Sequence, residues 1–246
     1  MTPIKPTSGP APRDGLRWPP LIAGTLIKRY KRFLADVKLE DGRTITAHCP
    51  NTGSMQACCE PGRRVYLSVH DNPKRKCPHT WELIAMPDSL VGVNTLTPNR
   101  LVKHAATRGS IPELRGYDAV RSEVRYGENS RVDLLLSGPD AARCYVEIKN
   151  CTLVRAKTAL FPDAVTARGL KHLQELARQV GPQCRSVIFF LVQRMDADCF
   201  RPADAIDPAY GRGLRGAVAA GVEMLAYDVQ IDLAGIRLRR ALPCRL

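Results

Sequence analysis

Long apolar runs are missing from this sequence of 246 residues. No stretch approaches the roughly 20 apolar residues that a membrane-spanning helix needs, and the N-terminus lacks the hydrophobic segment of a secretory signal peptide. The sequence also lacks CxxC pairs, and its nine cysteines are an odd number, so a disulfide framework is not expected. These absences predict a soluble, cytoplasmic protein with no membrane partner.

Zinc ligands at a recognisable spacing are missing as well. The first third of the chain contains four cysteines and three histidines that could bind zinc: Cys49, Cys58, Cys59, Cys77, His48, His70 and His79. Their spacing matches neither a zinc finger nor a zinc ribbon. We therefore interpret these cysteines as buried or half-buried thiols.

Acidic residues are fewer than basic ones. The sequence has 24 Asp and Glu against 37 Lys and Arg, which gives a formal net charge of +13. The excess is not confined to one tail, because residues 1–90 contain 14 basic and 8 acidic residues and the remainder contains 23 and 16. A surface with this excess attracts polyanions, so nucleic acid is the leading predicted partner.

The first 87 residues read as a leader followed by a small all-β domain. Residues 1–20 contain six prolines and little to bury, which predicts a disordered or extended leader outside the fold. Short apolar segments with tight turns then predict strands over residues 21–28, 33–39, 44–48, 64–69 and 81–86. Five such strands indicate a β-barrel over residues 21–87, resembling the oligonucleotide-binding (OB) fold.

Two basic clusters fall where the loops of such a barrel are expected. The first interleaves four cations, Lys28, Arg29, Lys31 and Arg32, with two aromatic rings, which suits phosphate contact and base stacking. The second, at the tip of a predicted hairpin, consists of three cations that we expect to be exposed, Lys74, Arg75 and Lys76. A solvated turn would explain either cluster alone, but the two together favour a polyanion.

Helical and strand patterns are mixed over residues 88–246. Helices are predicted over residues 94–107, over residues 163–180 with Asp163 as the cap, and after Asp207-Pro208. Strands are predicted over residues 119–126, 131–136, 144–148, 187–192, 222–229 and 236–242. This order predicts a mixed sheet with helices on its faces, so the fold class is α/β and β.

An acid and a base share one face of an apolar strand in this second domain. Glu147 and Lys149 alternate with Val146 and Ile148, and Asp133 lies in the preceding strand. Ionised groups inside an apolar sheet are costly unless a metal, a partner charge or a substrate compensates them. We interpret the three as a functional site, and the alternative is an internal salt bridge.

The order of Asp133, Glu147-Ile148-Lys149 and a following basic helix resembles the PD-(D/E)XK core of restriction-endonuclease-like proteins. Three segments are similar to signatures of the sugar fermentation stimulation protein (SfsA) family: Cys49-Pro50-Asn51-Thr52-Gly53-Ser54-Met55, Gly127-Glu128-Asn129-Ser130-Arg131-Val132-Asp133 and Phe161-Pro162-Asp163-Ala164-Val165-Thr166. The resemblance covers the chain from about Leu21 to its C-terminus. It implies an OB-like domain followed by a nuclease-like domain.

The resemblance also implies a function and a metal site. Members of the family are described as bacterial DNA-binding proteins linked to regulation of sugar-utilisation genes. Asp133 and Glu147 would hold Mg²⁺ or Mn²⁺, and Lys149 would occupy the position of the catalytic lysine. The Ile148 carbonyl could complete part of the metal shell, and Glu123 is our candidate for an additional acid.

Further residues are predicted to contact nucleic acid: Asn51 and Ser54 in the first signature, and Arg168 and Lys171 on the basic helix. One departure from the family pattern is Lys103-His104, where acidic residues are frequent. An acid at this position that assists metal binding in other members would be missing from this chain.

Three functions stay open at this point. The site suits a metal-dependent phosphodiesterase, that is, a nuclease. The same fold could serve a non-catalytic DNA-binding transcriptional regulator, and the barrel could bind RNA. The sequence identifies no sugar or other small-molecule ligand, and it leaves a homodimer open.

Overall fold

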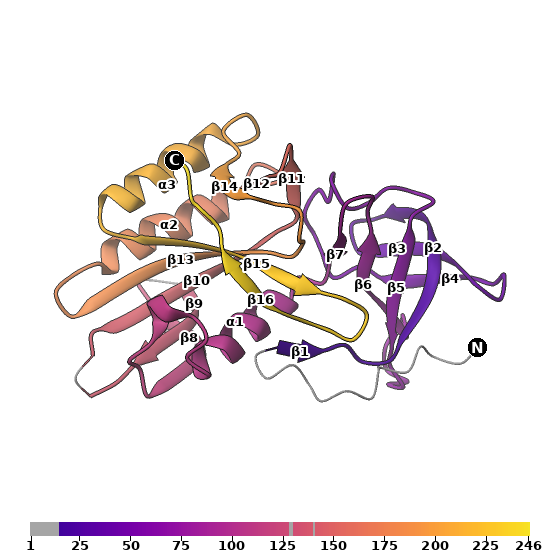
Figure 1. The fold of residues 1–246 in the computed structure, drawn as a ribbon, viewed down its shortest axis with the longest axis horizontal. Helices are drawn as coiled ribbons and strands as arrows, with labels where there is room; N and C mark the ends of the chain where they lie inside the picture. Colours follow the sequence, from indigo (N-terminus) through magenta and orange to yellow (C-terminus); the bar gives the residue numbers. More distant parts are fainter. Residues whose placement is uncertain (1–14, 128–129, 140) are drawn as a thin grey trace.

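The computed structural model describes residues 15–127, 130–139 and 141–246. Most of the expected leader, residues 1–14, and Glu128 and Asn129 of the second signature segment lie outside these residues. The chain forms a β-barrel beside a larger sheet that carries helices on its faces (Figure 1). The predicted fold class is therefore confirmed.

The barrel consists of five strands, β2 (Leu21–Tyr30), β3 (Leu34–Leu39), β4 (Thr44–His48), β5 (Arg64–Val69) and β6 (His79–Ala85). Four antiparallel pairings join them in a row, and a parallel pairing between β4 and β6 closes the barrel. Fully buried side chains such as Val37, Leu67 and Trp81 fill its interior. A sixth strand, β7 (Leu90–Gly92), pairs with β6, so the sheet of this domain extends past the boundary expected at residue 87.

The larger sheet has seven strands in the order β1-β16-β15-β13-β10-β9-β8. Their bounds are β1 (Gly15–Arg17), β8 (Ala119–Tyr126), β9 (Ser130–Ser137), β10 (Arg143–Cys151), β13 (Cys184–Val192), β15 (Glu223–Ile231) and β16 (Gly235–Ala241). The three central strands β10, β13 and β15 are parallel, and the outer pairings are antiparallel. The continuous apolar run over residues 187–192 of β13 follows from burial on both faces.

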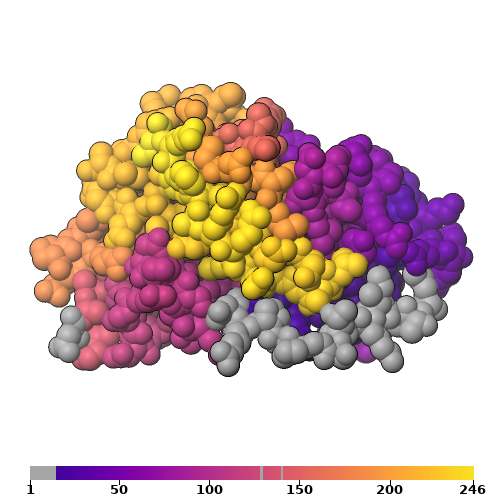
Figure 2. Space-filling model, in the orientation of Figure 1, coloured from indigo at the N-terminus to yellow at the C-terminus, as the bar shows by residue number. Residues whose placement is uncertain are grey.

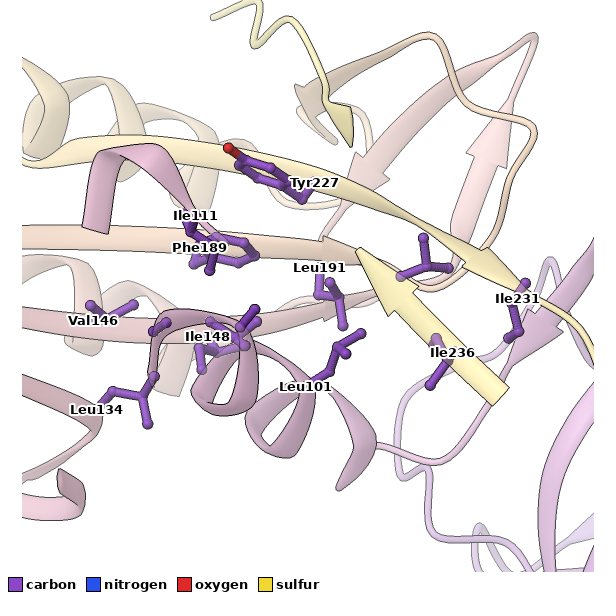
Figure 3. Packing of buried hydrophobic residues seen from close by; sticks show 14 of the residues in the cluster. Leu101, Ile111, Leu134, Val146, Ile148, Phe189, Leu191, Tyr227, Ile231 and Ile236 are labelled. Atoms are coloured by element: carbon purple, nitrogen blue, oxygen red, sulfur yellow. The ribbon is translucent and has the colours of Figure 1, made fainter. Parts of the chain in front are cut away.

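Helices cover both faces of this sheet. Helix α1 (Thr97–Thr107) packs on one face, where Leu101 lies near Ile148 and Leu191 (Figure 3). Helices α2 (Ala167–Gln179) and α3 (Pro208–Ala219) pack on the other face. A 3₁₀ helix, Pro112–Leu114, follows α1. The sheet therefore has two separate apolar layers, and side chains that alternate along β10 enter one or the other.

Three short strands form a second, small sheet that the sequence prediction did not include. They are β11 (Leu153–Arg155), β12 (Thr158–Phe161) and β14 (Cys199–Pro202). Strands of three or four residues carry too short an alternation to be identified from a pattern. Its strands β11 and β12 lie between β10 and α2 in the sequence, whereas β14 follows β13.

The expectation that all of residues 1–20 lie outside the fold is wrong for the last six. Gly15–Arg17 form β1, which pairs antiparallel with β16 at the edge of the seven-stranded sheet. The Trp18 side chain is buried, and its indole N–H donates to the Asp232 carbonyl oxygen at 2.9 Å. The proline content of residues 1–20 favoured a leader, although Gly15–Arg17 form a strand that pairs with β16.

Helix α2 begins later than predicted. Its N-cap is Thr166, whose hydroxyl accepts a hydrogen bond from the Gly169 N–H at 3.0 Å. Asp163, the expected cap, instead accepts from the Ser54 hydroxyl and the Met55 N–H, both at 3.0 Å. The carboxylate therefore joins the two domains. The predicted cap of α3 is confirmed, since Asp207 accepts from the Tyr210 N–H.

The two domains touch along a polar junction. Arg155 donates to the Gln56 side chain at 2.7 Å, and the Gly92 N–H donates to the Gln193 carbonyl oxygen at 2.9 Å. Figure 2 shows the C-terminal residues crossing one face of the molecule between the barrel and the helical part. Within the described residues, no helix has the length and apolar character needed to span a bilayer.

Candidate functional site

Asp133 lies where strands β9 and β10 separate. The ladder between them ends at the pair Leu134 and Val146. Beyond that pair, one carboxylate oxygen of Asp133 accepts the Ile148 N–H at 2.7 Å, and the other accepts the Asn99 amide of α1 at 2.7 Å. The side chain thus replaces a ladder hydrogen bond, and these two contacts fix its orientation.

Glu147 and Lys149 lie on the face of β10 that α2 covers, as their alternation predicts. The Lys149 ammonium donates to Glu147 Oε1 at 2.7 Å. His172 of α2 contacts the same oxygen through Nδ1, which also lies 3.2 Å from the Lys149 nitrogen. The Glu147 and Lys149 side chains are only 4% and 13% exposed, so this ion pair lies within the protein.

The hydrogen bonds of His172 define its tautomer. The Arg168 guanidinium can only donate, and its Nε lies 3.3 Å from His172 Nε2. His172 Nε2 therefore accepts, and the contact of Nδ1 with Glu147 Oε1 is made by a ring N–H. That proton is donated to Glu147. The exposed basic side of α2 is thereby connected to the buried carboxylate.

The two carboxylates have opposite pKa shifts. Burial and, secondly, the negative charge of Glu147 raise the pKa of Asp133 to about 6. Burial also acts to raise the pKa of Glu147, but the His172 hydrogen bond and the Lys149 charge outweigh it, so that pKa lies below its usual value. Glu147 is therefore the carboxylate that stays ionised, whereas Asp133 has no hydrogen-bonded cation among the described residues and Lys149 offsets its burial only in part.

These residues line a cavity of about 280 Å³ bounded by β9, β10, α1 and α2. One carboxylate oxygen of Glu147, Oε2, is buried there without a hydrogen-bond partner in the described chain. Buried carboxylate oxygens need a partner, and hard divalent cations prefer such oxygens as ligands. The free Glu147 oxygen and the partly compensated Asp133 carboxylate thus fit one divalent cation. Across the described residues, no group of three or more His, Cys, Asp and Glu is placed to hold a metal, so water or substrate oxygens must complete the shell.

A second cavity, of about 490 Å³, adjoins the first at the domain junction. The barrel contributes Arg29, Arg32 and residues 52–54, and the second domain contributes residues 161–166. Phe161 and Thr166 line both cavities. The cavity at the two barrel arginines and the cavity at the carboxylates are therefore neighbours that share these two lining residues.

The structure separates the residues of the first basic cluster by role. Arg29 is half-buried and donates to the carbonyl oxygens of Arg32, Asn51 and Gly53, so it ties two barrel loops together. Lys31 and Arg32 are exposed, and Lys28 forms a loose ion pair with Asp36 at 3.8 Å. Arg32 therefore lines the second cavity, and the loop-to-loop hydrogen bonds there are made by Arg29 instead.

Asn51 and Ser54 have structural contacts in the first signature segment. Asn51 is buried, and its side-chain oxygen accepts the Gly53 N–H at 2.8 Å. The Ser54 hydroxyl contacts Asp163 across the domain junction. The signature therefore shapes one wall of the second cavity.

The second basic cluster is only partly exposed. Lys74 and Lys76 face solvent, but Arg75 turns inward and donates to the Thr80 hydroxyl at 2.8 Å. The expectation of three exposed cations on this turn is wrong for Arg75. Its guanidinium lines a third cavity, of about 520 Å³, on another side of the barrel.

Glu123 does not lie at the carboxylate site. It is exposed at an irregularity of β8 with φ +55° and is not among the residues that line the 280 Å³ cavity. Ile148 does line this cavity, whereas Lys171 pairs with the buried Glu175 at 3.6 Å. Asn99 and His172 complete the site and were not predicted. The only sequence signal for His172 was its place on the buried side of a helical pattern.

Comparison with known proteins links both domains to one family. Residues 96–235 match the family model described as "Sugar fermentation stimulation protein RE domain", and residues 27–93 match "SfsA N-terminal OB domain". A sugar fermentation stimulation protein homolog of Pelobacter propionicus is 60% identical over 93% of this chain and 99% of its own length. A homolog from Geobacter sulfurreducens is 59% identical over 91% and 96%.

A solved structure has the same arrangement of both domains. The chain superimposes on Pyrococcus furiosus SfsA, solved in complex with Ca²⁺, with a TM-score of 0.86 and 25% sequence identity. The match covers 95% of this chain and 99% of that chain. The barrel and the mixed sheet thus form one conserved unit rather than two independent matches.

Proposed function

The chain belongs to the sugar fermentation stimulation protein (SfsA) family, and we propose that it binds DNA and hydrolyses phosphodiester bonds at a divalent-cation site formed by Asp133 and Glu147. One observation carries the proposal. One buried and one half-buried carboxylate meet a lysine in one cavity, and Glu147 Oε2 has no hydrogen-bond partner among the described residues. Buried carboxylate oxygens generally have a partner, and a cation in this cavity would supply one.

The donor set supports magnesium or manganese. Asp133, Glu147 and the Ile148 carbonyl offer oxygen ligands, which hard cations prefer, and the Pyrococcus furiosus relative was solved with Ca²⁺. When bound, such a cation supplies Lewis acidity, which acidifies a water molecule and offsets negative charge on a phosphate. A bound cation would offset the free-energy cost that burial places on the ionised Asp133 carboxylate.

Lys149 and His172 have separate roles in this proposal. Lys149 borders the cavity, so its ammonium can orient the attacking water or stabilise charge that develops on the phosphate. His172 holds Glu147 Oε1, which leaves Oε2 directed to other partners. We therefore assign His172 as a positioning residue.

The hollow at the domain junction supports a path for the DNA backbone. Arg29 and Arg32 line the 490 Å³ cavity, which shares Phe161 and Thr166 with the cavity of the carboxylates. Arg168 and Lys171 are exposed on α2 beside the site. Phosphates bound along these cations would bring one phosphodiester to Asp133 and Glu147.

A DNA-binding regulator without turnover is the second candidate. It is favoured by the Lys149 and His172 contacts, which already compensate the Glu147 charge without a metal. A regulatory role in sugar metabolism, in the bacterial cytoplasm, would then depend on binding alone. Fold similarity does not separate these two functions.

Cleavage assays separate them. Purified protein is incubated with supercoiled, linear and single-stranded DNA and with RNA, with Mg²⁺, Mn²⁺ or EDTA. Asp133→Asn and Lys149→Met are tested beside Glu123→Gln, which removes an exposed carboxylate of the same sheet away from the cavity. The proposal expects metal-dependent products that Asp133→Asn and Lys149→Met abolish and Glu123→Gln retains.

Binding measured on the same proteins distinguishes the alternatives. DNA binding with no cleavage, unchanged by EDTA and by Asp133→Asn, would reject the phosphodiesterase and leave the regulator. Preference for single-stranded RNA over duplex DNA would instead indicate an RNA-binding barrel.

A further inference from the structure

The third cavity, of about 520 Å³, is separate from the DNA path proposed above. It lies between the barrel, strand β1 and the start of α1. None of its lining residues lines the cavity that holds Asp133 and Glu147. The hollow is therefore a second site in the molecule, and the proposed function does not use it.

Cationic groups from three parts of the chain line this cavity. Arg17 comes from β1, Arg75 from the loop between β5 and β6, and Arg100 from the first turns of α1. Thr80 holds Arg75, which leaves further N–H groups of its guanidinium to donate. Arginine forks of this kind suit phosphate and carboxylate oxygens.

Two imidazoles lie among these arginines. His48 and His70 line the cavity, and burial together with the Arg75 charge lowers the pKa of His48. His48 is therefore neutral near pH 7, and the positive charge of the site comes from arginine. A neutral imidazole can donate or accept a hydrogen bond to a polar ligand.

The helix at the edge of the cavity adds to the positive potential. Leu96, the N-cap of α1, provides no side-chain cap, and the first turn has no acidic residue. Leu96 and Thr97 both line the cavity. The Thr97 N–H donates to the Asn94 carbonyl oxygen and Pro98 has no N–H, so the helix contributes its dipole rather than free donors. The helix end and the arginines thus act in the same direction.

The polar wall of the cavity contains one buried acid. Glu82 is 5% exposed, and its two carboxylate oxygens accept from the Ser68 hydroxyl and the Asn94 amide, each at 2.7 Å. Each oxygen keeps a lone pair that can accept from a ligand hydroxyl. A ligand that is anionic at one end and hydroxylated at the other matches three arginines and one carboxylate.

We infer that this cavity binds a small phosphorylated, hydroxylated molecule, with its phosphate at Arg75 and Arg100 and its hydroxyl groups toward Glu82. The cavity volume suits a ligand of this size rather than an extended strand. Glu82 disfavours a second phosphate, because it would repel a continuous backbone that carries one charge per nucleotide. The sequence alone gave no sign of such a ligand.

Calorimetric titration of the full-length protein tests the inference. The probes are ribose 5-phosphate, inorganic phosphate, ribose and a short single-stranded oligonucleotide, all in EDTA so that no metal recruits phosphate to the carboxylates. The variants are Arg75→Gln and Arg100→Gln. Matched controls are Lys74→Gln on the same loop and Lys103→Gln on the same helix, which remove exposed cations that do not line the cavity.

The expected result is saturable binding of ribose 5-phosphate and no binding of ribose. Arg75→Gln and Arg100→Gln should each weaken it by about tenfold, because each removes a charge-assisted hydrogen bond. Lys74→Gln, Lys103→Gln and Asp133→Asn should leave it unchanged.

Three results would overturn the inference. One is no saturable heat from either phosphorylated probe at roughly millimolar concentration. Another is equal affinity in wild type, Arg75→Gln and Arg100→Gln. The third is an oligonucleotide that binds through these two arginines while ribose 5-phosphate does not, which would assign the cavity to nucleic acid.

Discussion

Asp133 combines two hydrogen bonds with a charge that is only partly compensated. Its oxygens accept from Asn99 and from the Ile148 N–H, yet burial and Glu147 raise its pKa to about 6. The folded protein therefore binds more protons at this residue than the unfolded chain does between about pH 4 and pH 6. Stability from Asp133 is present at the acidic end of this window and is lost as the pH rises through about 6.

This linkage predicts a metal-sensitive stability difference. Between pH 4 and pH 7 in EDTA, the unfolding free energy of wild type should fall by on the order of 2 kcal/mol more than that of Asp133→Asn. Urea denaturation of both proteins at both pH values measures how the unfolding free energy of each changes with pH. Subtracting the change in Asp133→Asn from the change in wild type removes the contribution of the other titrating groups. Mn²⁺ at pH 7 should restore stability to wild type only. Parallel pH curves for the two proteins would contradict the pKa assignment.

His172 determines which Glu147 oxygen is free. His172→Ala removes the hydrogen bond to Oε1 while Glu147 stays buried, so the pKa of Glu147 should rise. We expect Mn²⁺ affinity relative to wild type to fall more at pH 6 than at pH 8, by roughly tenfold at pH 6. Calorimetric titration at the two pH values measures this loss.

Two variants accompany that measurement. His172→Gln keeps a side-chain donor and should recover part of the affinity, whereas His104→Ala removes an α1 histidine outside the carboxylate cavity and should leave it unchanged. An equal loss of Mn²⁺ affinity at pH 6 and pH 8 in His172→Ala would show that the imidazole contributes packing and does not affect the pKa of Glu147.

At the scale of single elements, α2 carries His172 and Arg168 to the site, so the start of this helix affects the chemistry. Its cap is the Thr166 hydroxyl, and the Thr166 N–H in turn donates to Asp207, the cap of α3. The two helices therefore begin at one shared hydrogen-bonded point. A change there should act on both the fold and the site.

Thr166→Ala should lower the unfolding free energy by about 1 kcal/mol, because it leaves an N–H of the first turn of α2 without its acceptor. Urea denaturation measures this loss, with Thr166→Ser as the control that keeps the hydroxyl. If Thr166→Ser is destabilised as much as Thr166→Ala, the methyl group rather than the cap is responsible.

Elements with long patterns were predictable, and those defined by distant contacts were not. The barrel strands and the shared face of Glu147 and Lys149 followed from alternation and turn residues, and the structure confirms them. Strand β1 was missed because its partner lies more than 200 residues away in the sequence. Asp163 was misassigned as a cap because its acceptor role exists only across the domain junction.

In the candidate site too, local sequence patterns predicted some residues, and tertiary packing alone brings in the others. Asp133, Glu147 and Lys149 were identified because ionised residues stand out in apolar strands. His172 reaches Glu147 only through the packing of α2 on β10, which no local pattern contains. Glu123 was chosen for its nearness in sequence, but the exposed position in β8 places it elsewhere.

At the scale of the whole molecule, two neighbouring arginines at the 490 Å³ cavity of the domain junction have different roles. Arg29 holds three carbonyl oxygens, whereas Arg32 is exposed at the same hollow. Arg32→Gln should weaken DNA binding without unfolding the barrel and lower the slope of log K against log salt by about 1. Fluorescence anisotropy over a salt series measures this change.

Lys38→Gln is the matched control, since Lys38 is an exposed cation of β3 that does not line the hollow. It should leave the slope closer to wild type than Arg32→Gln does. Equal slopes for all three proteins would place the DNA contact on another surface.

The pairing of β1 with β16 has a consequence for biosynthesis. Gly15 lies opposite Arg237, so the first strand of the described residues pairs with the last. At translation rates of about 5–20 residues per second, β1 waits on the order of ten seconds or more for its partner. The barrel is complete long before β16 is made, and during that wait β1 has no partner strand in its own chain. On one polysome, the exposed β16 edge of a chain further along in synthesis would compete for that β1.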